Sequence, residues 1–571
     1  SIALFFLFFC FSNILSSQLD DGSAYKNLKP FSSLEEDTLL DIDLDSNIIE
    51  NLSKLGKIWG FLKYYHPSIA EGNFDWDYEL FKILSLTLEA ENQNEFNSII
   101  SFWVKSLGKR KKEKKKKKES IKIEPDLKWI RNSQFKKKLT KQLLNIKNAT
   151  RTNNHYYIDL LPVIKNPKFK NEKAYRDNKY PDLEYRLLSL FRYWNIIQYY
   201  YPYRNLITEN WDNILKEFIP KFINSSNELD YKLNVLQLIA KINDTHANIW
   251  GVDDLLNNFK GLNRPPLTIN FIENRAVVVS FVNQAFENQS DLMIGDIINT
   301  INGIPVAEII KNRLIYTPAS NYTTKLRDIS KNLLRTNEKS INIEFVRNNS
   351  TSNCKMDCYS NDEINNCIID QKKESSFKLL TPEISYLNLG NINNSFLPSI
   401  ALEIQKTKGL IIDLRCYPSD FVVFTLTQYL LPKPIEFVKF SHGDIKEPGL
   451  FIYTHSLKVG TNNPKFYKGK VVILINEKTQ SQAEYTAMAL KVIPNATIIG
   501  STTAGADGNI SFFYLPGGIR TAISGIGVYY PDGTETQRVG IVPDLIIKPT
   551  IKGIIEHRDE LIEKAIELIT N

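Results

Sequence analysis

The sequence has few of the residues that bind metals or form disulfides. Its 571 residues include five cysteines and six histidines. Cys354, Cys358 and Cys367 follow a C-x3-C-x8-C spacing, but no histidine lies near them to complete a zinc site. We therefore predict no metal site and no cofactor. In an oxidising compartment, these cysteines would be able to form a disulfide within Cys354–Cys367.

The sequence also lacks long hydrophobic runs beyond its first residues. Residues 2–11 are apolar but too short to span a bilayer comfortably, and the small polar residues Ser12, Ser16 and Ser17 follow. This pattern is typical of a secretory signal and its cleavage zone. We expect residues 1–22 to be a signal peptide and the mature chain to be periplasmic or secreted, without stable membrane insertion. A retained anchor is the alternative.

Positive charge is not spread along the chain. The net charge is +7, yet the ten residues 109–118 alone carry nine positive charges and one glutamate. Outside this run the charge is close to balanced, so the run predicts a solvated tract rather than a nucleic-acid-binding face. We predict no nucleic-acid partner.

An internal repeat occupies the first half of the chain. Residues 55–67 with 75–80 match residues 191–202 with 210–215 at a single offset of 135 positions. Two tryptophan pairs, Trp59/Trp194 and Trp76/Trp211, keep this register. The apolar spacing predicts small helical units whose aromatic residues pack one helix against the next. An aromatic ligand site is the less favoured interpretation.

The region around Ser481 has the pattern of a strand, a turn and a helix. Val471–Ile475 is a continuous apolar run that predicts a buried strand, and an apolar-periodic helix begins at Ser481. Backbone N–H groups at a helix N-terminus can stabilise an oxyanion. On this pattern alone, the favoured interpretation is that Ser481 is an N-cap with Glu484 completing a capping box.

Several motifs then follow in a fixed order from residue 381 to the C-terminus. They read KGLIIDLRCYPSD, TQSQAEY, GSTTAGADG, LPGG, YYPDGT and GIVPDL. This series resembles the C-terminal processing (tail-specific) serine peptidases, and their tricorn-like branch more than the Ser/Lys branch. The resemblance implies that Ser481 is the nucleophile. It also implies a crotonase-like (Clp-protease-like) α/β catalytic core over residues 377–571.

The resemblance also suggests the base. The Ser/Lys branch has a lysine where this chain has Ala506, which favours a histidine base. His246 follows Asp244 and Thr245 in a D-x-H element similar to that of the family, and Thr245 offers a hydroxyl beside it. The position of the family's glutamate is Gln537, which carries no charge. Asp507 and Glu535 are other candidate carboxylates.

The remaining site residues are implied by the same resemblance. The oxyanion hole would combine the N–H of Gln482 with one from the loop containing Ser419. Residues 292–310 include a GD-I-I-x-x-I-N-G-x-P-V string similar to PDZ domains, which makes Gly295 and Asp296 candidates for peptide binding. PDZ domains bind peptides along a sheet edge and hold the terminal carboxylate on backbone amides.

These observations predict a multidomain α/β protein with helical N-terminal repeat units, a PDZ-like β domain and the catalytic core. The expected boundaries are 1–22 signal peptide, 47–108 helical repeat unit 1, 109–182 Lys-rich linker and excursion, 183–260 helical repeat unit 2, 262–350 PDZ-like domain, 351–376 Cys-containing insertion and 377–571 catalytic core.

The predicted function is that of an exported serine endopeptidase acting on unfolded or tail-exposed proteins. A catalytically inactive pseudo-peptidase that binds peptides is the alternative, because of Gln537, Ala506 and the lack of a glycine pair near Ser419. A non-proteolytic enzyme on a crotonase-like core is disfavoured by the signal and PDZ-like segments.

Overall fold

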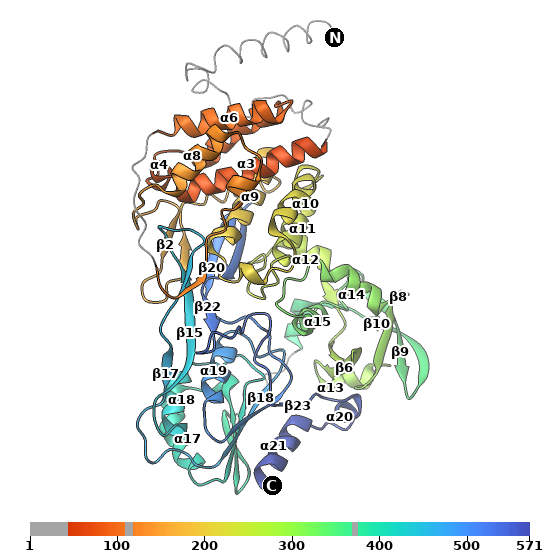
Figure 1. Cartoon of the computed structure of the whole chain (residues 1–571). Coiled ribbons are helices and arrows are strands. Elements are labelled where there is room, and N and C mark those ends of the chain that lie inside the picture. The colour runs from red at the N-terminus through yellow and green to blue at the C-terminus, as the bar shows by residue number, and fades with distance from the viewer. Residues whose placement is uncertain (1–43, 109–117, 368–374) are drawn as a thin grey trace. The chain divides into compact units, whose positions relative to one another are not determined.

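The computed structural model describes residues 44–108, 118–367 and 375–571 (Figure 1). These residues form two compact units. The first unit contains the residues up to 235, with 442–452 and 511–521; the second contains 236–441, 453–510 and 522–571. The predicted signal peptide lies outside the described residues, as does most of the Lys-rich run. Among the described residues, no helix is both long enough and apolar enough to cross a membrane.

The first unit is mainly helical (Figure 1). Its main helices are α3 (Ser46–Tyr65), α5 (Trp76–Leu88), α6 (Gln93–Ser106), α8 (Lys137–Lys147), α9 (Leu183–Tyr200) and α10 (Trp211–Ile223), and α11 (Glu228–Ala240) begins in it. Helix α3 ends at Tyr65, shortly before Pro67. Proline has no N–H to donate within a helix, and its ring clashes with the preceding turn.

The two matching stretches have the same local packing. The indole N–H of Trp59 donates to the carbonyl of Trp76 (3.0 Å), and that of Trp76 donates back to Trp59 (3.1 Å). Trp194 and Trp211 make the same reciprocal pair at 2.8 and 3.1 Å. Trp59, Trp76 and Trp194 are buried and Trp211 is partly buried, so these tryptophans are packing residues with satisfied indole groups.

Equivalent helices of the two copies also pack against each other. A Cβ on Gly60 of α3 would lie 1.8 Å from Asn195 of α9, the residue that matches Gly60 at the offset of 135. Asn195 donates its side-chain N–H to the carbonyl of Gly56 (2.9 Å). The small glycine thus lets the two helix backbones approach closely.

A group of charged side chains is buried beside these helices. Lys63 contacts Glu172 at 2.7 Å, and Arg192 contacts Asp77 at 2.8 Å and Glu172 at 2.9 Å. All four side chains are at most 6% exposed. The two positive and two negative charges balance, which is the condition for burying them.

Residues 118–182 differ from the predicted linker. They contain α8 and the strand β1 (Ile121–Ile123), which pairs antiparallel with β16 (Phe451–Tyr453). Leu139, Leu143 and Ile146 of α8 are fully buried. These apolar side chains at helical spacing make the stretch part of the first unit.

The second unit begins with a small sheet domain (residues 263–360). Its main sheet has the order β10-β9-β7-β6-β5, with β5 at one edge. The strands are β5 (Leu267–Ile272), β6 (Arg275–Phe281), β7 (Ile297–Ile301), β9 (Ser340–Arg347) and β10 (Ser350–Asp357), and the helices α14 (Val306–Leu314) and α15 (Tyr322–Ser330) accompany them. The expected insertion from 351 instead begins as β10, paired with β9 along its whole length. The cysteines of the described residues are free thiols.

A second sheet forms the core of this unit, with the order β12-β13-β14-β18-β19-β23. Its strands are β12 (Phe377–Thr381), β13 (Ile384–Asn388), β14 (Gly409–Asp413), β18 (Lys470–Ile475), β19 (Ala496–Gly500) and β23 (Leu545–Ile546). All neighbours are parallel except β12, which is antiparallel. The chain is therefore multidomain α/β with mixed sheets, as predicted.

Side-chain alternation in β18 explains why helices cover both faces of this sheet. Val471, Ile473 and Ile475 pack with α17 (Leu397–Ile404), α18 (Val423–Leu430) and α19 (Gln482–Lys491). Val472 and Leu474 pack on the other face with α21 (Glu560–Thr570). A strand buried on both faces reads as a continuous apolar run.

Candidate active site

Ser481 lies in the turn between β18 and α19, where the apolar run placed it. Its backbone has φ +56° and ψ −117°, a conformation that non-glycine residues rarely adopt. The N–H of Ser481 donates to the carbonyl of Ala506 (3.0 Å) and to Oε2 of Glu484 (3.1 Å). These two bonds hold the residue in the strained turn.

Glu484 fastens this turn to the loop that follows β19. Its buried carboxylate also accepts the N–H groups of Gly505 (2.8 Å) and Ala506 (3.0 Å), together with the hydroxyl of Thr503. Burial raises the pKa of Glu484, whereas these hydrogen bonds lower it. The glutamate expected in a capping box thus connects the Ser481 turn to the loop containing Gly505 and Ala506.

His246 lies in the turn after α11 and is almost completely buried. Its Nδ1 lies 2.9 Å from the hydroxyl of Ser524, and this hydroxyl donates to Oδ1 of Asp244 (3.0 Å). A carboxylate only accepts, so the single hydroxyl proton of Ser524 points to Asp244. Ser524 must then accept from Nδ1–H, which leaves the lone pair of the neutral imidazole on Nε2.

Asp244 is fully buried and accepts hydrogen bonds from several groups. Its carboxylate also accepts the N–H of Ser524 (2.7 Å), the N–H of His246 (3.0 Å) and the side-chain amide of Gln537 (3.3 Å). Burial lowers the pKa of His246, and the negative charge of Asp244 opposes this by raising it. Gln537 therefore acts on Asp244, not on the imidazole.

The loops around Gln537 and Ser481 are joined through Gly505. Arg538, next to Gln537, donates its N–H to the carbonyl of Gly505 (2.8 Å), while the N–H of Gly505 donates to Glu484. The loop containing Gly505 thus contacts both the segment of Gln537 and Arg538 and the turn that contains Ser481. Among the described residues, no hydrogen bond joins Ser481 to His246.

The other predicted catalytic residues have different partners. The hydroxyl of Thr245 donates to Ser320 (2.9 Å) and accepts the N–H of Ser320 (2.9 Å), so these two bonds engage it with Ser320 and not with the imidazole. Asp507 is buried, and both burial and the charge of Glu484 raise its pKa well above the usual range.

The loop containing Ser419 lies beside the start of α19. The side-chain amide of Gln482 donates to the carbonyl of Asp420 (2.9 Å). However, the N–H of Ser419 donates to the carbonyl of Leu389 (3.0 Å), and its hydroxyl donates to Ile392 (2.5 Å). The amide of Ser419 is thus already used within its own loop.

Gly295 and Asp296 have structural contacts. Asp296 is buried and accepts two hydrogen bonds from the guanidinium of Arg347, at 2.6 and 2.7 Å. Gly295 has φ +96°, and a Cβ there would lie 2.2 Å from Ile555. These contacts explain the GD pair at the turn before β7 as a structural feature. They do not require that either residue binds a peptide.

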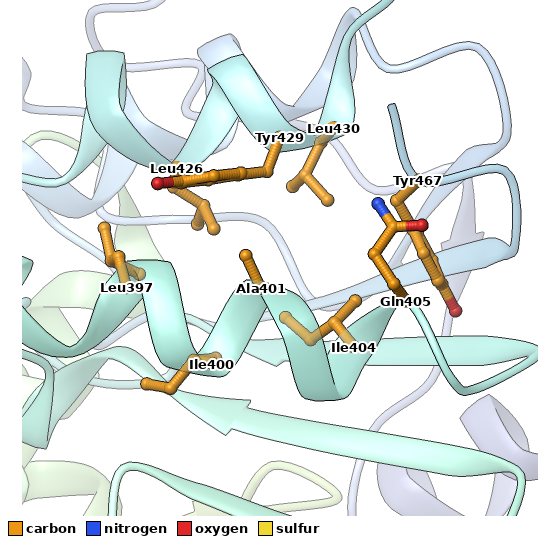
Figure 2. Close-up of a pocket in the computed structure, with 9 residues that line it drawn as sticks. All are labelled: Leu397, Ile400, Ala401, Ile404, Gln405, Leu426, Tyr429, Leu430 and Tyr467. Carbon is orange, nitrogen blue, oxygen red and sulfur yellow. The ribbon is translucent and has the colours of Figure 1, made fainter. Parts of the chain in front are cut away.

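Two hollows among the described residues differ greatly in size. The first lies between α17 and α18 and has a volume of about 10 Å³ (Figure 2). Figure 2 shows apolar side chains such as Leu397, Ala401 and Leu430 around it, so it is a packing gap. The second is a groove of about 640 Å³ in the second unit, and its lining includes β5, α15 and Gln480. Within the described ranges, no group of three or more acidic, histidine or cysteine side chains is arranged to hold a metal ion.

Two site residues were not identified from sequence. Ser524 lies in β21 (Ile519–Ser524) within a stretch that has no motif, so nothing in the sequence indicated its contact with His246. Asp244 is part of the D-x-H element, but the sequence did not indicate that it contacts His246 through Ser524. That link depends on a hydrogen bond between residues 280 positions apart.

Comparison with known proteins finds similarity to one peptidase family. Residues 384–547 match the model of peptidase family S41. A carboxyl-terminal-processing protease of Synechocystis sp. is 24% identical over 197 residues, which are 33% of this chain and 44% of that protein. The chain thus spans less than half the length of this curated relative.

Solved structures show the same fold at low sequence identity. Mature CPAF has a TM-score of 0.54 and 13% identity, with 68% of this chain and 98% of that chain covered. Mature CPAF complexed with lactacystin has a TM-score of 0.52 and 13% identity, covering 68% and 97%. Residues 384–547 are thus similar to peptidase family S41, and these solved structures share the fold of this chain.

Proposed function

We propose that this chain is an exported serine endopeptidase in which Ser481 is the nucleophile and His246 the base. The observation that carries the proposal is the strained backbone of Ser481 between a buried strand and a helix N-terminus. Such strain costs about 1–3 kcal/mol and persists where the surroundings over-determine it, which is common at active sites. An N-cap serine without a catalytic role would not require it.

The chemistry follows from the tautomer of His246. Nε2 accepts the hydroxyl proton of Ser481 as Oγ attacks the peptide carbonyl carbon, and the imidazolium then gives this proton to the leaving amine. Water hydrolyses the resulting ester by the same two transfers, which frees the acid and restores the serine. Asp244 stabilises the imidazolium through Ser524 and is the buried negative charge that Gln537 cannot provide.

The oxyanion hole combines two backbone amides. The N–H of Gln482 is the first of α19, where no intrahelical acceptor exists. Asp420 supplies the second, in place of Ser419. Within the described residues, neither of these N–H groups donates to another protein atom. Gln482 keeps the two amides together because its side chain binds the carbonyl of Asp420.

We also propose that the small sheet domain is PDZ-like and that the helix-covered sheet is a crotonase-like core. The edge of β5 offers unpaired backbone groups along the groove, so an extended peptide would add to it as a strand. Substrates are unfolded proteins or exposed tails, because only extended chain fits this geometry. Residues 1–22 direct export to the periplasm or the exterior.

The test is labelling and hydrolysis by the full mature chain. A fluorophosphonate should label the wild type and the variant His455→Ala, which changes an exposed histidine, but should not label Ser481→Ala. Ser481→Ala, His246→Ala and the double variant should each lose roughly four to six orders of magnitude in peptide turnover, because the two residues act as one unit.

A wild type that resists the label and hydrolyses no member of a broad peptide library would support the pseudo-peptidase alternative instead. Near-normal hydrolysis by His246→Ala, with Ser481→Ala inactive, would show that the base lies elsewhere.

A further inference from the structure

The groove along β5 has an unusual distribution of charge. Its lining includes Leu267 and Ile269 of β5 and Leu334 after α15, which give it an apolar floor. The basic side chains in the lining are Arg264, Arg327, Lys331, Arg335 and Lys478. Among the described residues that line the groove, none is acidic.

Two of these positive side chains share one acidic partner. Arg327 and Lys331 both contact Asp328, at 3.0 and 2.9 Å. Arg327 uses its remaining donors on the carbonyl of Glu477 and the side chain of Gln480. Arg327 is therefore held by these contacts, whereas Lys331 remains exposed beside the same carboxylate.

Three positive charges remain without an acidic partner in the described part of the chain. Arg335 donates only to neutral oxygens, including the carbonyl of Gly261 (2.6 Å), and Arg264 makes one long contact with the side chain of Asn361 (3.5 Å). Lys478 is exposed and forms no ion pair in this part of the structure. Burial and the charge of Arg264 lower the pKa of Arg335, so an anion placed here would relieve a repulsion.

The three charges come from different segments of the chain that line the groove. Arg264 precedes β5, and Arg335 is bonded to Gly261 near the same strand end. Lys478 lies on the turn before Ser481 that Arg327 binds. The groove thus offers basic side chains from the start of β5 and also from the turn before Ser481.

Backbone amides do not offer an alternative anion site at the start of β5. Residues 265 and 266 are both proline and have no N–H, while the carbonyl of Pro266 accepts from Val282 (2.9 Å). Guanidinium and ammonium groups are therefore the donors that face an incoming peptide here.

We propose that this groove selects extended peptide segments with several acidic side chains. The apolar floor takes alternate side chains of the added strand, and Arg264, Arg335 and Lys478 pair with carboxylates of the others. The inference deepens the proposed function by naming its substrate class, and it rests on that function for the hydrolysis step only.

Binding to the full-length variant Ser481→Ala tests the proposal without turnover. The probes are two rhodamine-labelled peptides of about ten residues, one alternating Val and Glu and the other alternating Val and Gln. The Glu peptide should bind roughly tenfold more tightly at low salt, and high salt should remove most of this difference. Adding Arg264→Gln and Lys478→Gln should abolish the preference, whereas Lys311→Gln, an exposed lysine outside the groove, should keep it.

The outcomes separate the two proposals. Equal affinity for the two peptides overturns the acidic selection, and so does a loss of Glu-peptide binding when its C-terminus is amidated. If fluorophosphonate still labels wild-type Ser481 in that case, the peptidase proposal stands alone. If the Glu peptide is preferred but Ser481 is not labelled, the groove inference stands and the peptidase proposal fails.

Discussion

Replacing Asp244 with asparagine tests how His246 is positioned. In the wild type, the carboxylate accepts from both the N–H and the hydroxyl of Ser524. An asparagine has one acceptor and one donor at these places. If its oxygen accepts the N–H of Ser524, its amide donates to the hydroxyl. Ser524 then donates to Nδ1, and the neutral imidazole carries its proton on Nε2, where it cannot act as a base.

The charge lost in this variant sets the expected magnitude. Nδ1 of His246 and Oδ1 of Asp244 are 3.8 Å apart. At an effective dielectric constant of about 20, two unit charges at this distance attract by about 4 kcal/mol, which corresponds to roughly a thousandfold in rate. Asp244→Asn should therefore lower kcat by about three orders of magnitude and change KM little, because Asp244 does not contact substrate on this proposal.

The pH profile provides an independent measurement. Activity requires neutral His246, so it rises with pH through the pKa of the imidazole. Burial lowers this pKa and the charge of Asp244 raises it. Removing the charge should shift the acidic limb of the kcat profile to lower pH. Asp254→Asn, which changes an exposed aspartate in α12 (Asp254–Lys260), should alter neither quantity. A kcat within a few-fold of wild type and an unmoved acidic limb would refute the role of Asp244.

Two further predictions concern stability, measured by urea unfolding. Lys63→Met removes one positive partner of the buried Glu172 and should lower the free energy of unfolding by about 3–5 kcal/mol. Lys173→Met, at an exposed pair, should lower it by less than about 1 kcal/mol. Equal losses in the two variants would contradict the buried network. Ser481→Gly should be about 1 kcal/mol more stable than Ser481→Ala, because glycine adopts positive φ without strain. This difference should remain even though glycine makes the unfolded chain more flexible. An alanine variant of equal or greater stability would show that the turn is not strained.

Local patterns in the sequence were sufficient to predict the elements around Ser481. The apolar run at Val471–Ile475 is β18, and the helix begins at Gln482, because burial on both faces and helix periodicity are properties of neighbouring residues. The strained φ of Ser481 was not predictable from this pattern. This φ depends on hydrogen bonds from the N–H of Ser481 to Glu484 and to Ala506. Ala506 is distant in sequence and lies beside the turn only in the folded chain.

Contacts between distant segments limited the rest of the site prediction. Thr245 is adjacent to His246 in sequence, but neighbouring side chains in a turn point in different directions, and its hydroxyl binds Ser320 instead. The prolines before β5 were visible in the sequence, and their missing N–H groups already argued against a carboxylate site built from amides there. Their importance became clear only when β5 proved to be the edge strand that lines the groove.

The positions of the proposed catalytic residues also define the smallest active fragment. Ser481, Ser524 and Gln537 lie within residues 384–547, the range that matches the peptidase family, whereas Asp244 and His246 lie more than a hundred positions before it. The matched range therefore contains the nucleophile and the hydroxyl that orients the base, but not the base itself. Asp244 is held by groups from the matched range, since Ser524 and Gln537 both donate to it. On this proposal, the turn after α11 is part of the peptidase, and a fragment that begins at residue 384 would lack the group that takes the proton.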